Sequence, residues 1–278
     1  MGTSGYAYDD WKGPFYPADL RPADYLPFYA RYFPFAELNS TYYRPPSPFM
    51  MRQLARKAPQ HFRMAVKAFS GITHDRSRLE DAVSFRRALA PLEEAGKLAC
   101  VLLQFPYSFR PDPAHREYLR RVVEVFQGLP VAVEFRHAAW VADEATFQLL
   151  QELGAGFVCV DEPRLAGLVP PVVRATGPVG YVRFHGRNAA KWWRHEQPYE
   201  RYDYLYSESE LREWVPRIRE LAEQTRDTFV AMNNHYQAKA VINARMLQQL
   251  LGLQEAAGFR PDPGTGPDTP ATAGRVHP

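Results

Sequence analysis

Short hydrophobic runs, rich in β-branched and aromatic residues, recur along the chain and alternate with longer segments of helical periodicity. The helical segments, such as 79–96 and 114–129, repeat apolar residues every three or four positions. Near-continuous apolar strands that alternate with helices are typical of a parallel sheet covered on both faces. We predict eight strands, at 2–7, 35–41, 62–68, 100–106, 131–137, 156–162, 181–186 and 228–234.

Eight such units predict an α/β fold, a single closed (β/α)8 TIM barrel. The sixth unit is irregular, because segment 163–178 contains too many prolines for a regular helix. An open doubly wound sheet is the alternative, but no Gly-x-Gly-x-x-Gly follows a strand near the start. We expect the barrel to span 1–254, and the Pro/Gly-rich segment 255–278 to be a flexible, disordered tail.

Polar side chains collect toward the C-terminal ends of the predicted strands. In a (β/α)8 barrel these ends form the mouth that carries the active site. Since side chains alternate between the two faces of a strand, Arg183 and His185 share one face of theirs. The whole set is Glu37, Asn39, Lys67, Gln104, Glu134, Arg136, Asp161, Arg183, His185 and Asn233.

Two interpretations of this set stay open. The charged members could form a balanced structural network inside the barrel, because buried charges are costly unless they are paired. Alternatively they form a functional site, which their collection at one end of the barrel favours. If Arg183 binds an anion, Arg183→Ala should weaken anion binding and leave the fold intact.

Composition places few further limits on function. Of the 278 residues, 46% are hydrophobic, which suffices for a large core. The formal charge of +3 is too small to indicate nucleic acid by itself, so the placement of charge must decide. Cys100 and Cys159 lie in apolar runs, which indicates buried thiols in a reducing compartment.

Several classes of protein are disfavoured by missing patterns. The sequence has no phosphate-binding P-loop motif and no Gly-x-Ser-x-Gly motif of an acyl-transfer serine. Both cysteines lie in the middle of apolar strands, which argues against a thiol nucleophile. No apolar run approaches the ~18 residues that span a bilayer, and the N-terminus does not resemble a signal peptide. We expect a cytoplasmic protein with no membrane partner.

The segment after the seventh predicted strand is unusually basic and aromatic. It contains Trp192 and Trp193 between Lys191 and Arg194, a combination suited to stacking bases beside a phosphate backbone. We predict that this loop faces the substrate. The predicted substrate-binding residues are Asn39, Arg136, His137, Arg183, Arg187, Lys191, Trp192, Trp193, Arg194, Asn233 and Asn234.

The predicted catalytic residues are acids and bases at the strand ends: Glu37, Lys67, Glu134, Asp161 and His185. Three of them, Glu134, Asp161 and His185, are also the predicted ligands of a divalent metal that would activate water for attack on a phosphodiester. The leading hypothesis is therefore an enzyme acting on an anionic, phosphate-bearing substrate, with hydrolysis of nucleic acid as its most specific form. Some nucleases with a barrel fold build metal sites from His and carboxylate ligands, and the comparison with them is an analogy of fold.

Two other hypotheses are kept. The first is a sugar or sugar-phosphate isomerase or lyase, in which carboxylates, His185 and Lys67 transfer protons and aromatic residues stack on the sugar. The proposed stacking residues are Tyr6, Tyr43, Trp140 and Trp192. The second is a non-catalytic module that binds an anion or nucleic acid. A wide basic groove would favour a polymer, and a closed pocket would favour a small molecule.

Seven motifs together resemble the DUF72 (YecE-like) family of bacterial and archaeal proteins over residues 2–251. They are GTSGYAYDDWKGPFYP (2–17), ELNSTYYRPPS (37–47), FRMAVKAFSGITH (62–74), LLQFPYSF (102–109), VEFRHAAW (133–140), YVRFHGR (181–187) and NNHYQAKAVINA (233–244). The resemblance implies a TIM barrel and the location of the site, but no reaction, because the family's function is not established. The chain lacks the glycine that more often follows the Asn pair in this family, so the loop after the eighth strand differs here.

Overall fold

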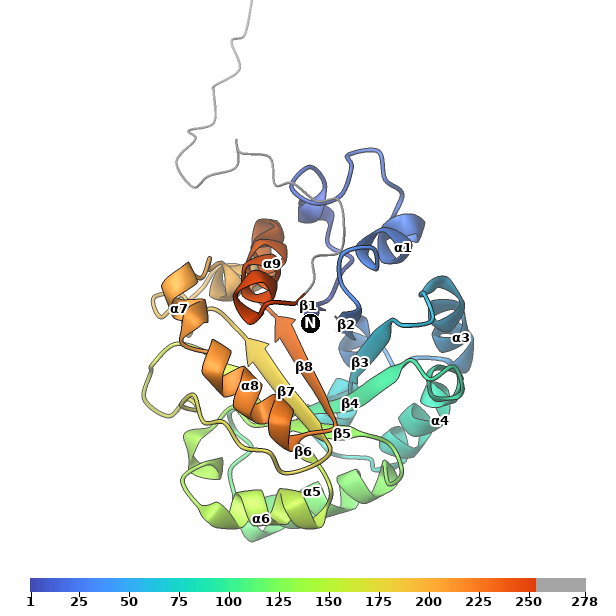
Figure 1. The fold of residues 1–278 in the computed structure, drawn as a ribbon. Helices are drawn as coiled ribbons and strands as arrows, with labels where there is room; N and C mark the ends of the chain where they lie inside the picture. The colour runs from blue at the N-terminus through green and yellow to red at the C-terminus, as the bar shows by residue number, and fades with distance from the viewer. Residues whose placement is uncertain (254–278) are drawn as a thin grey trace, which may run out of the picture.

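A computed structural model describes residues 1–253 of the chain as a closed barrel of eight parallel strands in sequence order (Figure 1). The strands are β1 (Gly2–Ser4), β2 (Phe35–Leu38), β3 (Arg63–Lys67), β4 (Leu98–Gln104), β5 (Val131–Glu134), β6 (Gly156–Asp161), β7 (Val179–Phe184) and β8 (Asp227–Met232). Pairing of β1 with β8, which places Gly2 beside Ala231, closes the barrel. The predicted (β/α)8 TIM barrel is confirmed. The predicted tail at 255–278 lies outside the described residues.

The helices surround the strands, as Figure 1 shows. They are α1 (Tyr25–Tyr29), α2 (Ser40–Tyr43), α3 (Pro48–Lys57), α4 (Glu80–Glu94), α5 (Pro113–Val125), α6 (Glu144–Glu152), α7 (Glu208–Arg212), α8 (Val215–Gln224) and α9 (Lys239–Leu251). Short 3-10 or π turns are η1 (Asp9–Trp11), η2 (Pro22–Asp24), η3 (Gly71–Asp75), η4 (Ala138–Trp140), η5 (Pro198–Tyr202) and η6 (Tyr236–Ala238). As predicted, no helix forms between β6 and β7, where Pro163, Pro170 and Pro171 interrupt the chain.

Local sequence signals set where several helices begin. Proline occupies the first position of α3 and α5, where its missing N–H costs nothing. Side-chain oxygens of Ser47, Asp112 and Asp143 accept hydrogen bonds from backbone N–H groups in the first turns of α3, α5 and α6. These caps and prolines could be read directly from the sequence.

Most strands end earlier than the sequence predicts. The run predicted at 35–41 ends at Leu38, and residues 40–43 form helix α2 instead. Arg136, His137, His185 and Asn233 also follow their strands and lie in loops at the barrel mouth. The alternation of hydrophobic and polar residues continues past the last backbone hydrogen bond of a strand into the following loop. The sequence pattern therefore does not mark where the strand ends.

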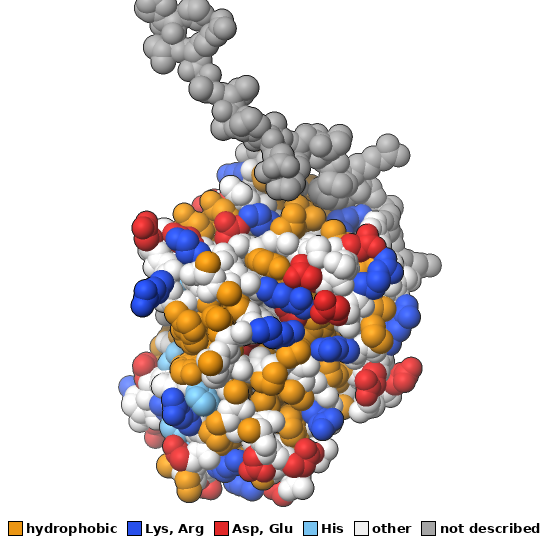
Figure 2. Space-filling model, turned by 90° about the vertical axis from the view of Figure 1, so that its left-hand side faces the viewer, with side chains coloured by type: hydrophobic (Ala, Val, Ile, Leu, Met, Phe, Trp, Pro, Cys, Tyr) orange, Lys and Arg blue, Asp and Glu red, His pale blue; other side chains and the backbone are white. Residues whose placement is uncertain are grey.

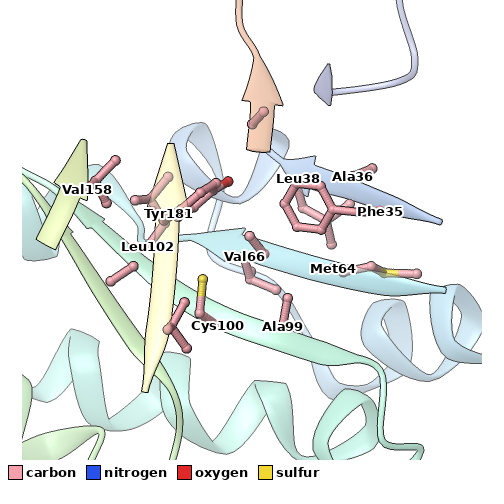
Figure 3. Packing of buried hydrophobic residues seen from close by; sticks show 14 of the residues in the cluster. Phe35, Ala36, Leu38, Met64, Val66, Ala99, Cys100, Leu102, Val158 and Tyr181 are labelled. Atoms are coloured by element: carbon pink, nitrogen blue, oxygen red, sulfur yellow. The ribbon is translucent and has the colours of Figure 1, made fainter. Parts of the chain in front are cut away.

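The bottom of the barrel interior is aromatic and the layer above it is charged. Phe35 stacks on Phe229 with ring centroids 4.9 Å apart, and Tyr181 meets Phe35 edge to face. Figure 3 shows Phe35, Cys100 and Tyr181 among the buried side chains around β2, β4 and β7. Both cysteines are free and buried, as expected. This packing closes the barrel below the mouth, so that any site must open at the C-terminal ends of the strands.

Candidate functional site

Arg183 is the centre of a buried ion-pair cluster that crosses the barrel. Its guanidinium donates to both oxygens of Glu37, at 2.9 Å from Nε and 2.6 Å from Nη2, and to Glu134 Oε2 at 2.5 Å. A weaker contact at 3.3 Å reaches Ser4 Oγ, and Tyr181 donates to Glu37 at 2.6 Å. Arg183 is only 1% exposed, and burial would lower its pKa, but the two carboxylates raise it. The guanidinium is committed to internal partners but also lines the pocket described below, so its role as an anion contact stays a prediction.

Glu134 connects this cluster to the barrel mouth. Its Oε1 lies 2.7 Å from Arg136 Nε and 3.1 Å from His185 Nε2. Burial alone would raise the pKa of Glu134, but Arg136, Arg183 and His185 hold it well below 4.5. Glu134 is therefore an anion that three cationic or donor groups surround, which makes it a poor proton acceptor. Its predicted role as a general base is not supported by this geometry.

His185 is held in one orientation and one protonation state. Asn233 Nδ2 lies 2.9 Å from His185 Nδ1, so Nδ1 accepts this hydrogen bond and Nε2–H donates to Glu134. Burial, then the charge of Arg136, lowers the pKa of His185 to about 3. The ring is thus neutral and fully buried. It does not line the pocket described next, so we interpret His185 as a residue that positions Asn233 and Glu134.

A pocket of about 640 Å³ opens at the barrel mouth above this cluster. Its floor contains Glu37, Arg183, Arg136, Lys67 and Asn233. Its other lining residues come from the loops after several strands and from α2 and α3: Gly5, Tyr6, Ala7, Tyr8, Leu38, Asn39, Ser40, Tyr42, Tyr43, Met50, Leu54, Pro198, Tyr199, Tyr202 and His235. A pocket of this size and closed floor suits a small molecule.

Lys67 is the one cation of the pocket lining that has no ion pair among residues 1–253. It is the last residue of β3, and its Nζ lies 4.4 Å from the ring centroid of Tyr42. Within residues 1–253 no carboxylate forms an ion pair with it, whereas Glu37, Arg136 and Arg183 are all paired. Burial, reinforced by the charge of Arg183, lowers the pKa of Lys67 from 10.5 to about 7. A substantial fraction of Lys67 is therefore a neutral amine at neutral pH.

This lowered pKa predicts a pH dependence of stability. Between pH 7 and 10.5 the unfolded chain holds a proton on Lys67 that the folded chain has lost, so stability rises with pH over this window. We expect the free energy of unfolding of the wild type, relative to Lys67→Met, to rise by at most about 1.4 kcal/mol per pH unit. Urea denaturation of both proteins across this range measures it. A difference that stays constant with pH would contradict the lowered pKa.

Asp161 lies on the other side of the sheet from this cluster. In the β6–β7 register Val160 pairs with Arg183 and Asp161 pairs with Phe184, so Asp161 points away from the interior. It accepts hydrogen bonds from Trp214 Nε1 at 2.7 Å and from Tyr206 OH at 2.8 Å. Arg187 contacts both of its oxygens, at 2.8 and 2.7 Å. Asp161 and Arg187 are therefore bonded to each other away from the pocket, and the predicted roles of Asp161 in catalysis and of Arg187 in substrate contact stay predictions that this geometry does not favour.

The predicted metal site is not formed, because Glu134 and His185 lie inside the barrel and Asp161 lies outside it. Across the described part of the chain, no group of three or more His, Cys, Asp or Glu side chains is arranged to hold a metal ion. Two histidines near the barrel mouth also have local partners, since His137 caps η4 and His74 Nδ1 lies 2.9 Å from Thr73 Oγ1.

The loop between β7 and α7 lines the pocket with residues other than those predicted. Trp192 is buried beneath Arg201, whose Nε donates to its carbonyl, and Lys191 pairs with Glu200 at 2.7 Å. Trp193 is 50% exposed and packs against Tyr107, and Arg194 is exposed. None of these four lines the pocket. The loop instead folds back on η5, and the predicted substrate contact of these residues stays a prediction.

Aromatic residues that the sequence did not single out form the pocket wall. Tyr199 and Tyr202 come from η5, and Tyr8 stacks on His235 with ring centroids 4.5 Å apart. Of the aromatics proposed from sequence, Tyr6 and Tyr43 do line the pocket, but Trp140 is buried against Phe135. The missed residues lie in loops without periodicity, and only the high density of tyrosine between 199 and 206 could have indicated them.

The remaining predicted residues divide between the pocket and the fold. Asn39 lines the pocket, and its Oδ1 is buried without a partner among the described residues. Asn234 is fully buried and donates to Tyr204 O and Asn243 Oδ1, which anchors the loop after β8. His137 does not reach the pocket. No helix within residues 1–253 is both long enough and apolar enough to cross a bilayer.

Comparisons with known proteins agree with the fold. The family model described as "Protein of unknown function DUF72" matches residues 1–267. The UPF0759 protein YunF of Bacillus subtilis (strain 168) is 32% identical over 94% of this chain and 97% of its own length. A crystal structure of a DUF72 family protein from Thermotoga maritima MSB8 is 40% identical, with a TM-score of 0.83, over 90% of this chain and 98% of that one. A DUF72 family protein from Enterococcus faecalis V583 is 27% identical, with a TM-score of 0.82, over 94% and 98%.

Proposed function

This chain belongs to the DUF72 family, whose function is not known, and from the chemistry of its pocket we propose that it is an enzyme acting on a small, anionic carbonyl compound such as a sugar phosphate. The reaction class that suits the pocket is isomerisation or lyase chemistry, in which protons move to and from carbon next to a carbonyl group. The observation that carries the proposal is an amine, Lys67, unpaired among the described residues, beside a guanidinium with a donor to spare, Arg136.

Arg136 supplies the anion contact. Its Nε is paired with Glu134 and its Nη1 with Glu162 at 3.2 Å, which fixes the plane of the guanidinium. The Nη2 group has no hydrogen-bond partner in residues 1–253, and the residue lines the pocket. A guanidinium oriented in this way is suited to a phosphate or carboxylate. Glu134 and His185 then serve the site indirectly, by holding Arg136 and Asn233 in place.

Lys67 supplies the group that exchanges protons. General acid–base catalysis is most effective when the pKa of the group lies near the working pH. Burial brings the pKa of Lys67 to about 7, so both protonation states are available at neutral pH. Glu134, a buried carboxylate locked in ion pairs, lacks this freedom, because its pKa is held well below 4.5.

The shape and charge of the mouth favour a small molecule over a polymer. Tyrosines wall the pocket, and such rings stack on sugar faces. The basic residues predicted to contact nucleic acid are instead engaged within the fold, as with Arg187 and Lys191. On the face that Figure 2 shows, Lys and Arg side chains are interspersed with Asp and Glu and form no continuous basic stripe. Nucleic-acid binding stays a prediction that the following experiment also tests.

Isothermal titration calorimetry with glycerol 3-phosphate tests the anion site. We expect binding by the wild type and at least tenfold weaker binding by Arg136→Lys, because lysine cannot pair with Glu134 and Glu162 and still present a donor to the pocket. The loop variant Lys191→Met/Arg194→Met is the matched control and should keep its affinity within about twofold. Urea denaturation establishes that the variants are folded.

The opposite result identifies the competing function. Salt-sensitive binding of a single-stranded oligonucleotide, lost in the loop variant, combined with no binding of the small phosphate, would favour the nucleic-acid hypothesis. Equal loss of small-phosphate affinity in both variants would remove Arg136 from the anion site.

A further inference from the structure

Lys67 has the surroundings of a nucleophilic amine. It ends β3 at the floor of the pocket, with its ammonium over the face of Tyr42 and no carboxylate paired with it in the described residues. The nearest acids are already occupied, Glu37 by Arg183 and Tyr181 and Glu134 by Arg136, Arg183 and His185. Lys67 is half-buried at the pocket floor, where an ammonium without a counter-ion is costly, so fold stability alone gives little reason for a lysine here.

From this geometry we propose that Lys67 Nζ forms a covalent imine with the aldehyde or ketone carbon of the substrate. The inference rests on the proposed function and names its chemical step. The lone pair of the neutral amine attacks the carbonyl carbon, and the π electrons of the C=O bond move to oxygen. Proton transfer and loss of that oxygen as one water molecule leave the C=N bond, so no oxidant or reductant is needed. Amines whose charge is disfavoured by desolvation and by nearby cations are suited to this chemistry.

The protonation state of Lys67 supports the step. At pH 7 an ordinary lysine is neutral in fewer than roughly one molecule in a thousand. Burial and the charge of Arg183 lower the pKa of Lys67 to about 7, so a substantial fraction of it is the reactive form. With this pKa the imine-forming step reaches its full rate from near neutral pH upward.

The pocket around Lys67 matches a phosphorylated, hydroxylated carbonyl compound. Arg136 offers its free Nη2 to the anionic end. Two polar atoms of lining residues, Asn39 Oδ1 and His235 Nδ1, are buried without hydrogen-bond partners within residues 1–253. Such atoms are costly to bury, and a substrate hydroxyl group, which both donates and accepts, would satisfy either atom once its side chain turns toward the pocket. Aldoses and ketoses that carry a phosphate combine an anionic end for Arg136, hydroxyl groups for the buried polar atoms and a carbonyl carbon for Lys67.

Borohydride trapping tests the covalent step. The wild-type chain is incubated with glyceraldehyde 3-phosphate and sodium cyanoborohydride, and the adduct is quantified by intact mass and located by peptide mapping. We expect one adduct at Lys67, formed at a rate that rises with pH to about 7 and then levels off, whereas surface lysines continue to gain reactivity toward pH 10. Lys67→Arg should reduce this adduct by at least twentyfold, and the exposed-lysine control Lys191→Arg should not change it.

A second comparison separates this inference from the proposed function. Glycolaldehyde, which has no phosphate, should label Lys67 at least tenfold more slowly, and Arg136→Lys should remove that preference. Phosphate binding without labelling of Lys67 would overturn the imine and leave the anion site standing. If the wild-type chain neither binds the small phosphate nor is labelled at Lys67, the proposed function itself is rejected. Labelling spread evenly over surface lysines would also overturn the inference.

Discussion

Arg183→Met is expected to lower the free energy of unfolding by about 3–5 kcal/mol, the largest loss that we predict for a single substitution. The change removes the only cation that pairs with Glu37 among the described residues, leaving Tyr181 as its hydrogen-bond donor, and it also takes one of the partners of Glu134. Both carboxylates are fully buried, so neither recovers its lost partner from water. This expectation replaces the sequence-based one, in which Arg183→Ala leaves the fold intact.

Urea denaturation with the matched control Arg164→Met measures this loss. Arg164 also pairs with a buried acid, Asp161, but at 3.7 Å and with a side chain that is 48% exposed, so its loss should cost less than about 1 kcal/mol. Adding Glu37→Gln and Glu134→Gln to Arg183→Met should restore part of the stability, because the stranded charges are then absent. Equal stability of Arg183→Met and Arg164→Met would contradict the buried cluster.

Asp161→Asn is expected to cost about 3 kcal/mol and to leave ligand binding unchanged. The substitution preserves size but puts an amide NH2 in place of one oxygen, where it faces either Trp214 Nε1 and Arg187 Nη2 or Tyr206 OH and Arg187 Nε. These donors come from the N-cap of α8 and from the loop between β7 and α7, so the change should loosen the attachment of both to the sheet.

Two measurements on Asp161→Asn distinguish a structural from a catalytic role. Its free energy of unfolding is compared with that of Asp227→Asn, which removes an exposed pair with Arg226 and should cost less than about 0.5 kcal/mol. Its affinity for glycerol 3-phosphate, measured where the variant is folded, should equal that of the wild type. Weakened binding with unchanged stability would return Asp161 to the active site.

The charge of the barrel mouth has a further consequence for its chemistry. Burial raises the pKa of Glu162, the second partner of Arg136, to about 7, close to the lowered pKa of Lys67. Near neutral pH, Lys67 in the pocket and Glu162, which pairs with Arg136 but does not line the pocket, are each partly protonated. The net charge of the mouth is therefore sensitive to a bound anion, which would favour protonation of both groups.

The sequence by itself determined the fold and the end of the barrel that carries the polar residues. Both depend on local patterns, namely hydrophobic alternation in strands, helical periodicity between them, and prolines that exclude a helix from the sixth unit. Lys67, Arg136, Asn39 and Asn233 could be assigned to the mouth because each follows or ends a strand, and C-terminal strand ends converge in a barrel.

Only the tertiary structure decided which of these residues share a space. Whether Asp161 faces the lumen depends on the register between β6 and β7, which places it opposite Phe184 and not Arg183. Strand register is set by contacts between segments distant in the chain, and a shift of one residue reverses every side chain. In the same way, Tyr199 and His235 reach the pocket because η5 packs against η6. The burial of Trp192 depends on Arg201, whose guanidinium lies over its ring. Sequence patterns carry no record of these long-range contacts. The polar residues at the strand ends could therefore be predicted, but not which of them line the pocket, which form the buried ion-pair cluster and which bind other parts of the fold.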